Sequence, residues 1–280
     1  MANKKTILVG AGHMGGALAA GWLANKRAGG LSTEDLVILD PSPSEEIQAL
    51  ISKHNLKHID MLGLNEASEI GMIVLAVKPQ MFDKATDGLK LILPTDCAIL
   101  SILAGTPIKR LAEIFGDRPI IRAMPNTPAA IGAGITVCVA NEAGEARKQD
   151  ATRLLKVTGQ VEWVEDERLI GPVTAVSGSG PAYVFLLAEA LAAAGFSEGL
   201  PRDLADKLAR ETIIGAGALL ASTDKTPQEL RRAVTSSGGT TQAALDVLMG
   251  GGGGLPELVR QAVNAAERRS RKMATETNGR

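Results

Sequence analysis

Aromatic side chains are scarce in this sequence. The 280 residues include four Phe, two Trp and one Tyr, together 2% of the chain. Proteins that bind single-stranded nucleic acid stack its bases on aromatic rings, so this scarcity argues against that function. Apolar residues still make up 45% of the chain. We therefore expect a core that is filled by Ala, Leu, Ile and Val.

An excess of charge of one sign is also absent. The chain has 30 Lys and Arg against 31 Asp and Glu, a net charge of −1, and its pI is about 6.3. Such a chain creates no field that attracts nucleic acid or an anionic membrane. We expect neither as a partner.

Cysteine and histidine are too few for a disulfide framework or a zinc site. Cys97 and Cys138 lie far apart in apolar runs, and His13, His54 and His58 are scattered. Free cysteines are typical of proteins in a reducing compartment. The sequence predicts no bound metal and a cytoplasmic protein.

The N-terminal apolar run resembles a signal peptide at first sight. Lys4 and Lys5 precede it, and it extends from Ile7 to Ala24. However, it contains His13 and five glycines before Trp22, which a signal peptide would not. We interpret the run as a strand, a glycine turn and a helix, and we expect no membrane insertion.

Short aliphatic runs alternate with helical segments through the first 167 residues. We predict strands at 5–9, 36–40, 73–77, 98–103, 119–122, 135–139 and 161–164, and helices at 16–26 and 44–54. Continuous aliphatic strands alternating with helices indicate a parallel sheet that is covered on both faces.

The pattern changes near residue 168, after which no strand-like run occurs. Ala and Leu in helical spacing cover 181–220, 227–234, 240–249 and 256–273, and the tail 275–280 is expected to fray. The predicted fold class is α/β, with an N-terminal Rossmann-type parallel-sheet domain (1–167) and a C-terminal all-helical domain (168–280). The glycine run 250–254 has no evident role.

A glycine pattern follows the first strand and opens a helix. In this context Gly10-x-Gly12-x-x-Gly15 indicates dinucleotide binding. Glycines let the backbone approach a pyrophosphate, and a helix N-terminus offers free N–H groups. A tight turn without a ligand is the alternative. His13 is interpreted as a loop residue rather than a catalyst, since no partner acid is visible.

The end of the second strand bears on which nicotinamide cofactor binds. Asp40 lies 25 residues after Gly15, near the distance at which an acid hydrogen-bonds a ribose 2′-hydroxyl. No Arg follows to hold a 2′-phosphate, although Ser42 and Ser44 could. NADH and NADPH both remain open, and the alternative role of Asp40 is that of a turn residue before Pro41.

Three later strand ends carry small or polar residues at the edge where ligands of open parallel sheets bind. They are Ala76-Val77-Lys78-Pro79, Ile102-Leu103-Ala104 and the loop that contains Asn126 between two prolines. The prolines stiffen that loop, which suits an amide that holds a ring in place. We expect one continuous crevice, in which Lys78 either meets the cofactor or is solvated.

Two glycine–serine segments interrupt the helical region. Ser177-Gly178-Ser179-Gly180-Pro181 is equally consistent with a tight interdomain turn and with ligand contact. Thr235-Ser236-Ser237-Gly238-Gly239-Thr240-Thr241 precedes a helix and can form a nest for a small anion such as a carboxylate. Capping by Thr240 needs only one hydroxyl, so we favour anion binding.

The helical region offers no obvious general acid or base. It contains no His, and Lys207 and Lys225 lie on polar helix faces or loops. Hydride addition to an already protonated C=N bond fits this absence, whereas reduction of a ketone needs a stronger proton donor.

Five motifs, in order along the chain, resemble those of the pyrroline-5-carboxylate reductase family. They are Gly10-x-Gly12-x-Met14, Ala76-Val77-Lys78-Pro79, Arg122-Ala123-Met124-Pro125-Asn126-Thr127-Pro128, Ser177-Gly178-Ser179-Gly180-Pro181-Ala182-Tyr183 and Ser236-x-Gly238-Gly239-Thr240-Thr241. The resemblance implies reduction of L-1-pyrroline-5-carboxylate to L-proline with NADPH or NADH, the last step of proline biosynthesis. It also implies a helical dimerisation domain and a homodimer or a decamer of dimers.

The resemblance also implies roles for individual residues. The residues expected to contact the cofactor are Gly10, Ala11, Gly12, His13, Met14 and Gly15 at the pyrophosphate, Ser42 and Asn65 near the adenosine ribose, and Ala76, Val77, Lys78, Pro79, Ile102, Leu103, Ala104 and Asn126 by the nicotinamide half. Asp40 joins this set through its spacing after Gly15 and not through the resemblance. The substrate carboxylate would contact Ser236, Ser237, Gly238, Gly239 and Thr240. Thr241 would hydrogen-bond the ring nitrogen and is the predicted catalytic residue.

Some positions depart from the family pattern. Ser237 stands where proline is usual, His13 replaces a common asparagine, and Gly71 occupies a place that is usually acidic. Two alternatives are weighed against the family function. A β-hydroxyacid dehydrogenase would need a lysine on the helix 181–200, which has none. A silent NAD(P)H sensor would have a degraded 236–241 loop, and this loop is intact.

Overall fold

The computed structural model describes residues 4–24 and 30–278. Contacts divide the chain into two units, each described by itself. The sheet unit comprises Met1–Gly178 and Ala266–Arg280, and the helical unit comprises Ser179–Ala265. The domain division predicted from the sequence, at residue 168, differs from this contact-based division and remains a prediction.

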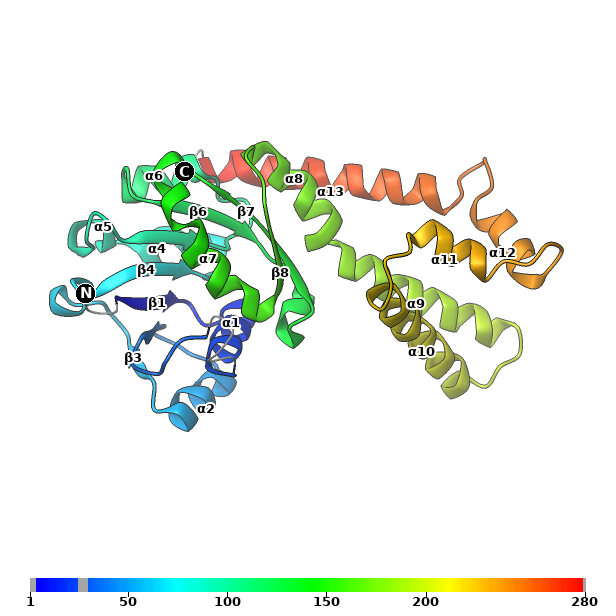
Figure 1. Cartoon of the computed structure of the whole chain (residues 1–280), viewed down its shortest axis with the longest axis horizontal. Helices are drawn as coiled ribbons and strands as arrows, with labels where there is room; N and C mark the ends of the chain where they lie inside the picture. The colour runs from blue at the N-terminus through cyan, green and yellow to red at the C-terminus, as the bar shows by residue number, and fades with distance from the viewer. Residues whose placement is uncertain (1–3, 25–29, 279–280) are drawn as a thin grey trace. The chain divides into compact units, whose positions relative to one another are not determined.

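The sheet unit is built on one eight-stranded sheet in the order β3-β2-β1-β4-β5-β6-β7-β8 (Figure 1). The strands are β1 (Lys5–Val9), β2 (Leu36–Leu39), β3 (Lys57–Ile59), β4 (Ile70–Leu75), β5 (Ala98–Ser101), β6 (Ile120–Met124), β7 (Gly134–Ala140) and β8 (Gly159–Trp163). The first six follow the 3-2-1-4-5-6 order of a dinucleotide-binding fold, whose ligand crevice lies where β1 and β4 diverge. The predicted Rossmann-type sheet is confirmed.

Two features of the sheet were not predicted. Strand β3 has one apolar residue, Ile59, so no aliphatic run marks it in the sequence. Strand β7 pairs antiparallel with β6, whereas the other pairs are parallel. Residues 125–133 connect β6 to β7, and a connection this short permits a return but no parallel crossover.

Helices and short 3-10 turns connect the strands. The α-helices are α1 (His13–Ala24), α2 (Glu45–His54), α3 (Leu64–Ala67), α4 (Phe82–Thr86), α5 (Leu89–Ile92), α6 (Ile108–Phe115), α7 (Lys148–Leu155) and α8 (Ile170–Val173). The 3-10 helices are η1 (Pro79–Met81), η2 (Thr127–Ile131), η3 (Glu142–Arg147), η4 (Lys156–Thr158) and η5 (Glu167–Leu169). Residues 25 and 26 of the predicted first helix lie outside the described residues.

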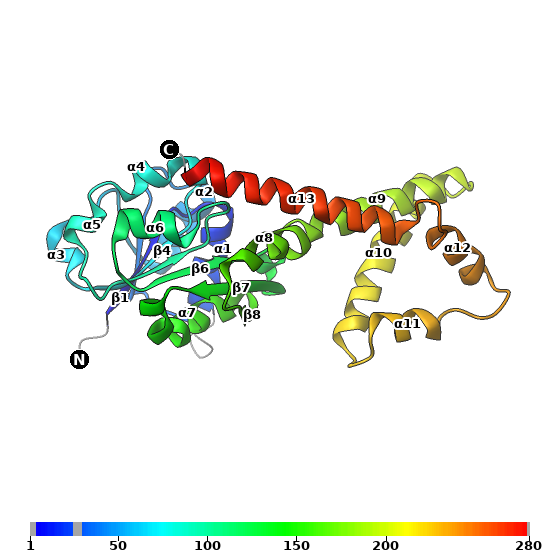
Figure 2. The same cartoon turned by 90° about the horizontal axis from the view of Figure 1, so that it is seen from above.

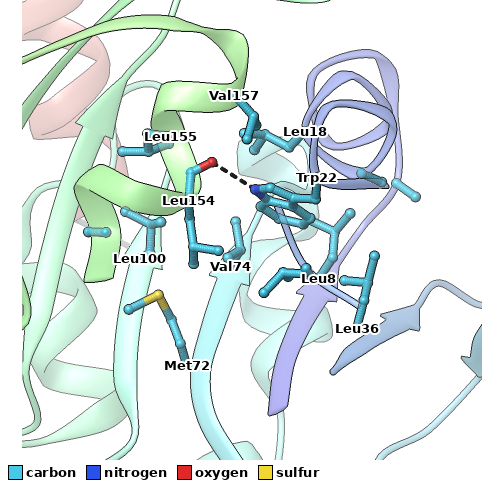
Figure 3. Packing of buried hydrophobic residues seen from close by; sticks show 14 of the residues in the cluster. Leu8, Leu18, Trp22, Leu36, Met72, Val74, Leu100, Leu154, Leu155 and Val157 are labelled. Carbon is cyan, nitrogen blue, oxygen red and sulfur yellow. Dashed lines mark hydrogen bonds between the residues drawn. The ribbon is translucent and has the colours of Figure 1, made fainter. Parts of the chain in front are cut away.

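Both faces of the sheet are covered. On β4, Met72 and Val74 join the cluster that includes α1 and α7, while Ile73 and Leu75 join the cluster that includes α4, α5 and α6. Figure 3 shows the first cluster, in which Trp22 of α1 donates its indole N–H to the Leu154 carbonyl at 2.7 Å. The largest side chain of the core thus buries its ring without an unpaired polar group.

The helical unit begins after a π-helical turn, η6 (Thr174–Gly178). It contains α9 (Gly180–Ser197), α10 (Arg202–Ala221), α11 (Pro227–Ala233), α12 (Thr240–Leu248) and the first part of α13 (Leu255–Asn278). The stretch predicted as helical over 181–220 is interrupted before Pro201, where Gly199 has a φ of +96°. The tail expected to fray from residue 275 is helical to Asn278.

The last turns of α13 belong to the sheet unit. A side chain on Gly105, after β5, would lie 3.1 Å from the Cβ atom of Met273. A side chain on Gly171, in α8, would lie 3.5 Å from the Glu267 carboxylate. The sheet unit is therefore completed by residues that follow the helical unit in the sequence.

Only part of the glycine run 250–254 has a geometric reason. Gly253 has a φ of +125°, and a Cβ atom on Gly254 would lie 2.7 Å from the Leu248 carbonyl oxygen. Gly251 and Gly252 have no atom within 4 Å of such a Cβ. The run forms the turn between α12 and α13, and its last two positions require glycine.

Within the described ranges, one helical stretch, Glu167–Ser197, is long and apolar enough to cross a membrane. Length and composition alone are weak evidence for a span, but only 6% of its most apolar window is buried within the chain. On α9, Phe185 and Leu186 are 66% and 63% exposed. An apolar helix this exposed needs a covering surface.

Candidate functional site

The glycine motif forms the turn from β1 to α1, and each of its three glycines has a separate reason. Gly10 has a φ of +83°, and a Cβ atom there would lie 2.6 Å from a methyl carbon of Val77. A Cβ atom on Gly15 would lie 2.4 Å from the Gly10 carbonyl oxygen. Gly12 has open space around it. A dinucleotide-binding loop needs these same three properties: its first glycine allows a tight turn, its second leaves room for the pyrophosphate, and its third allows close packing of the helix.

The N-terminus of α1 is available to an anion. The Gly16 amide donates to the carbonyl of Gly12, the residue just before α1, at 2.7 Å. The amides before it belong to the first turn, whose N–H groups have no partner within a helix. His13, the first residue of α1, is exposed. The loop can therefore present N–H groups to a phosphate.

Asp40 braces the glycine loop from the end of β2. Its Oδ2 accepts a hydrogen bond from the Ala11 amide at 2.8 Å, and its Oδ1 accepts from the Ser42 amide at 3.0 Å. The ring nitrogen Nε2 of His58 lies 2.8 Å from the Asp40 carbonyl oxygen. Both carboxylate oxygens thus hold the backbone. The Ser42 contact is the turn role that was weighed as the alternative, and the Ala11 contact was not foreseen.

We expect Asp40→Ala to weaken the binding of NADPH and NADH by a similar factor. Each lost hydrogen bond costs about 0.5–1.5 kcal/mol, so the dissociation constants should rise about three- to tenfold. The two dissociation constants can be measured by titrating each reduced cofactor with the protein and following the cofactor's fluorescence. Asp60→Ala, which removes a nearby carboxylate that is 77% exposed, is the control. A gain in NADPH affinity alone would instead assign Asp40 to repelling the 2′-phosphate.

The predicted strand ends meet beside the glycine loop. The Ala76 amide donates to the Val9 carbonyl at 2.9 Å, and the Ile102 amide donates to the Leu75 carbonyl at 3.0 Å. Val77 packs against Gly10, and Ala76 packs against Gly15. The ends of β1, β4 and β5 therefore form one edge beside the glycine loop. Lys78, at the start of η1, is exposed there.

A pocket of about 160 Å³ lies next to this edge within the sheet unit. Its lining includes Pro79 and Ala104, two of the predicted cofactor residues, together with Arg110, Arg269 and Met273. The last turns of α13 thus contribute to the surroundings of the loops that follow β4 and β5. No site residue was predicted in α13.

Asn126 holds its own loop in place. Its Oδ1 accepts from the Ile135 amide at 3.0 Å, and its carbonyl accepts from the Ala129 amide at 3.1 Å. The side-chain oxygen is therefore used to fix the loop to β7. The Nδ2 group is the part of the amide that can donate to a ligand.

Asn65 lies apart from these strand ends. It is exposed on α3, and its carbonyl accepts a hydrogen bond from the Ser68 hydroxyl. Its helix neighbour Glu66 pairs with Lys57, the first residue of β3, at 3.3 Å. Figure 2 shows α3 at the end of the sheet where β1 begins. The structure thus brings Ser42 close to the glycine loop through Asp40, but it does not bring Asn65 there.

The hydroxyl-rich loop of the helical unit starts α12. Gly238 has a φ of +69°, and the Gly239 amide donates to the Ser236 carbonyl at 3.1 Å. Gly239, not Thr240, is the N-cap residue, and no side chain caps the helix. Capping by Thr240, the alternative weighed above, is therefore not what the structure contains. The Thr235 hydroxyl donates to the Arg231 carbonyl at 2.7 Å, whereas Thr240 and Thr241 occupy the first helical turn.

The segment 177–181 is not a tight turn. Ser177 lies in the π-helical turn η6 and donates its hydroxyl to the Val173 carbonyl at 3.0 Å, and Pro181 lies in the first turn of α9. The helix continues through this segment with a local change of pitch. Turns of this kind occur often at functional sites, but no contact here identifies a ligand.

Metal and thiol chemistry find no support in the described part of the chain. Over residues 4–24 and 30–278, no three or more His, Cys, Asp or Glu side chains gather as metal ligands would. Burial raises the pKa of Cys97 and of Cys138 to about 12. Both thiols are therefore protonated at neutral pH and unsuited to act as nucleophiles.

A partly buried ion pair at the same edge was not predicted from the sequence. Arg122 of β6 donates to Glu167 Oε1 at 2.7 Å, and the Ile108 amide at the start of α6 donates to the same oxygen at 2.8 Å. Arg122 appeared in the sequence only as part of a motif. Its partner lies 45 residues further on, so no local pattern indicates it.

Comparisons with known proteins cover the whole chain. The family model described as pyrroline-5-carboxylate reductase dimerisation matches residues 167–273, and that described as NADP oxidoreductase, coenzyme F420-dependent, matches residues 5–105. The N-terminal match supports an NADP-binding domain, and the C-terminal match places a dimerisation region in this chain.

Individual relatives agree with these matches. The pyrroline-5-carboxylate reductase of Pseudomonas aeruginosa is 37% identical over 276 residues, 98% of each chain. The structure of a pyrroline-5-carboxylate reductase from Coxiella burnetii has a TM-score of 0.88 at 32% identity, covering 97% of this chain and 99% of that one. Plasmodium falciparum pyrroline carboxylate reductase, solved with NADP bound, has a TM-score of 0.80 at 30% identity, covering 98% and 99%. With such identity over nearly the full length of both chains, this chain belongs to the pyrroline-5-carboxylate reductase family.

Proposed function

We propose that this chain reduces L-1-pyrroline-5-carboxylate to L-proline by hydride transfer from NADPH or NADH. The observation that carries the proposal is the glycine loop, whose three positions are built as a pyrophosphate cradle in a chain with full-length relatives of that name. The reaction is the last step of proline biosynthesis. The lysine that a β-hydroxyacid dehydrogenase would need is absent from α9.

The cofactor would lie across the carboxyl edge of the sheet unit. In this assignment residues 10–15 bind the pyrophosphate, and Ser42 lies near the adenosine ribose. The ends of β4 and β5 and the Asn126 amide flank the nicotinamide. The contacts of Gly10 with Val77 and of Gly15 with Ala76 support this assignment, because the glycine loop lies directly beside the residues that follow β4. Asn65 is the weakest member of the predicted set, given its place on α3.

The substrate would be held through its carboxylate by Ser236, Ser237, Gly238, Gly239 and Thr240. The absence of a side-chain cap on α12 supports this role, because the amides of its first turn remain available to an anion. Thr241, in the same turn, is our candidate for the group that hydrogen-bonds the ring nitrogen.

The chemistry asks little of the protein beyond positioning. When bound, NADPH or NADH would supply a hydride from nicotinamide C4 to the imine carbon of the protonated substrate, so that the C=N π pair becomes the nitrogen lone pair and proline and the oxidised cofactor result. No proton has to move to carbon from a side chain, which agrees with the lack of His in the helical region. Orientation and neutralisation of the carboxylate then supply most of the rate enhancement.

A second copy of the chain is the proposed partner. The helical stretch Glu167–Ser197 lies within the region matched by the dimerisation model, and its exposed apolar side chains, such as Phe185, would be buried in a homodimer. Light scattering after gel filtration measures the mass and separates a dimer from a decamer of dimers. We propose a cytoplasmic location for this dimer. A monomer, in which the apolar helix stays uncovered, would contradict the proposed partner.

The direct test is oxidation of NADPH and of NADH, side by side, with L-1-pyrroline-5-carboxylate. We expect turnover that depends on the imine, and it is measured as the loss of reduced-nicotinamide absorbance. The ratio of the two kcat/KM values gives the cofactor preference. Cofactor binding without turnover would contradict the proposed function and favour the sensor alternative.

A further inference from the structure

We propose that Glu167 is a positioning residue for hydride transfer, because one of its carboxylate oxygens ties together the two loops that would hold the nicotinamide. This inference rests on the proposed function. The loops are 102–107, which follows β5, and 124–128, which begins at the last residue of β6 and contains Asn126.

The tie is made at a single atom. Glu167 Oε1 accepts from Arg122 Nη1 at 2.7 Å and from the Ile108 amide at 2.8 Å. The Arg122 side chain is 8% exposed and that of Glu167 is 30% exposed. A guanidinium this buried needs a counter-charge with good hydrogen bonds, and Glu167 supplies it.

The first loop depends on Glu167 as a helix cap. The N-cap residue of α6 is Pro107, which makes no side-chain capping bond. The Glu167 carboxylate instead accepts from the first amide of α6, where a negative charge is also favoured by the helix dipole. Since α6 begins directly after residues 102–107, its start fixes where that loop ends.

The second loop depends on Glu167 through Arg122. Arg122 lies on β6 four residues before Asn126, so the ion pair holds the strand end from which the Asn126 loop departs. The two loops come from neighbouring strands, and the nicotinamide would lie between them. If one of these loops moves the nicotinamide by about 1 Å relative to the substrate, the reaction can slow by roughly a hundredfold.

Asn141 offers a matched control at the other end of the same strand. Its Oδ1 accepts from the Ile120 amide at 2.9 Å, and its Nδ2 donates to the Arg118 carbonyl at 3.0 Å. Asn141→Ala therefore removes bonds that hold β6, but at the end away from the cofactor edge. It separates a general loss of stability from a loss of positioning.

The test compares full-length Glu167→Ala, Glu167→Gln and Asn141→Ala. Glu167→Ala should lower kcat about tenfold or more, with a smaller change in the KM for imine, and raise the isotope effect with NADPH deuterated at C4. Glu167→Gln should recover part of kcat, because both bonds go to one oxygen that a carboxamide retains, whereas the counter-charge for Arg122 is lost. Asn141→Ala should lose thermal stability while kcat and the isotope effect stay near those of the unmodified protein.

Amide hydrogen exchange gives a readout that does not need turnover. Exchange in 102–107 and 124–128 should accelerate in Glu167→Ala and stay unchanged in Asn141→Ala. Equal kcat and isotope effects in Glu167→Ala and the unmodified enzyme would overturn the inference, as would unchanged exchange in both loops. If the unmodified protein does not reduce the imine, the proposed function fails, and the exchange rates still decide whether Glu167 ties the loops.

Discussion

Gly12→Val should lower the affinity for NADPH and NADH at least about tenfold, or 1.4 kcal/mol, while leaving the melting temperature nearly unchanged. A Cβ atom at this position would have no atom within 4 Å apart from those of the adjacent residues, so the fold has room for a side chain. The space that it would fill is the space that a pyrophosphate needs to approach the backbone. Isothermal titration of each cofactor together with thermal unfolding measures both effects.

Two other glycines provide the comparison. Gly252→Val also adds a side chain where no atom lies within 4 Å, but in the turn between α12 and α13, and it should leave cofactor binding unchanged. Gly10→Ala should destabilise the protein, because the residue has a φ of +83° and its Cβ atom would lie 2.6 Å from Val77. Unchanged cofactor affinity in Gly12→Val would exclude the glycine loop as the pyrophosphate site.

Thr241→Ala should lower kcat for imine reduction about ten- to a hundredfold without changing the dissociation constant of the cofactor. A hydrogen bond to a charged group is worth about 1.5–3 kcal/mol, and the ring nitrogen carries the positive charge of the protonated imine before hydride arrives. Thr241→Ser keeps the hydroxyl and should recover most of the rate. Steady-state kinetics with saturating NADPH, together with cofactor titration, provide the measurement.

Thr235→Ala is the matched control for Thr241. Thr235 belongs to the same loop, but its hydroxyl already donates to the Arg231 carbonyl at 2.7 Å, so its loss should affect stability more than turnover. If Thr241→Ala keeps full activity, Thr241 has no part in the mechanism and the nitrogen must be stabilised by another group.

The fold was largely predictable because its signal is local. An aliphatic run such as Ile73–Val77 is typical of a strand in a parallel sheet with helices on each side, and the structure buries its first three residues, Ile73 to Leu75, in that way. Strand β3 was not predicted because it is an edge strand with a single apolar residue, so the sequence contains no aliphatic run at that place. The antiparallel return of β7 depends on the length of a connection, which could not be judged until the ends of β6 and β7 were known.

Parts of the candidate site that lie within one segment of the sequence could be predicted. Contacts between residues that are distant in the sequence could not. The glycine loop is contiguous, so its spacing identified it. The Asp40 carboxylate was placed correctly at the end of β2, but its bond to Ala11 spans 29 residues and cannot be inferred from spacing. Glu167 is harder still, since its partners lie on β6 and α6 and nothing in its own neighbourhood marks it.

The return of α13 to the sheet unit has a consequence for how the protein is made. Residues 266–278, which include the contacts of Glu267 and Met273 with the sheet unit, leave the ribosome after the whole of the helical unit. The nascent sheet can pair its eight strands early, but the surroundings of the β5 loop are completed only after the helical unit has been synthesised. A newly synthesised chain thus completes this edge of the sheet only after most of the matched dimerisation region has emerged.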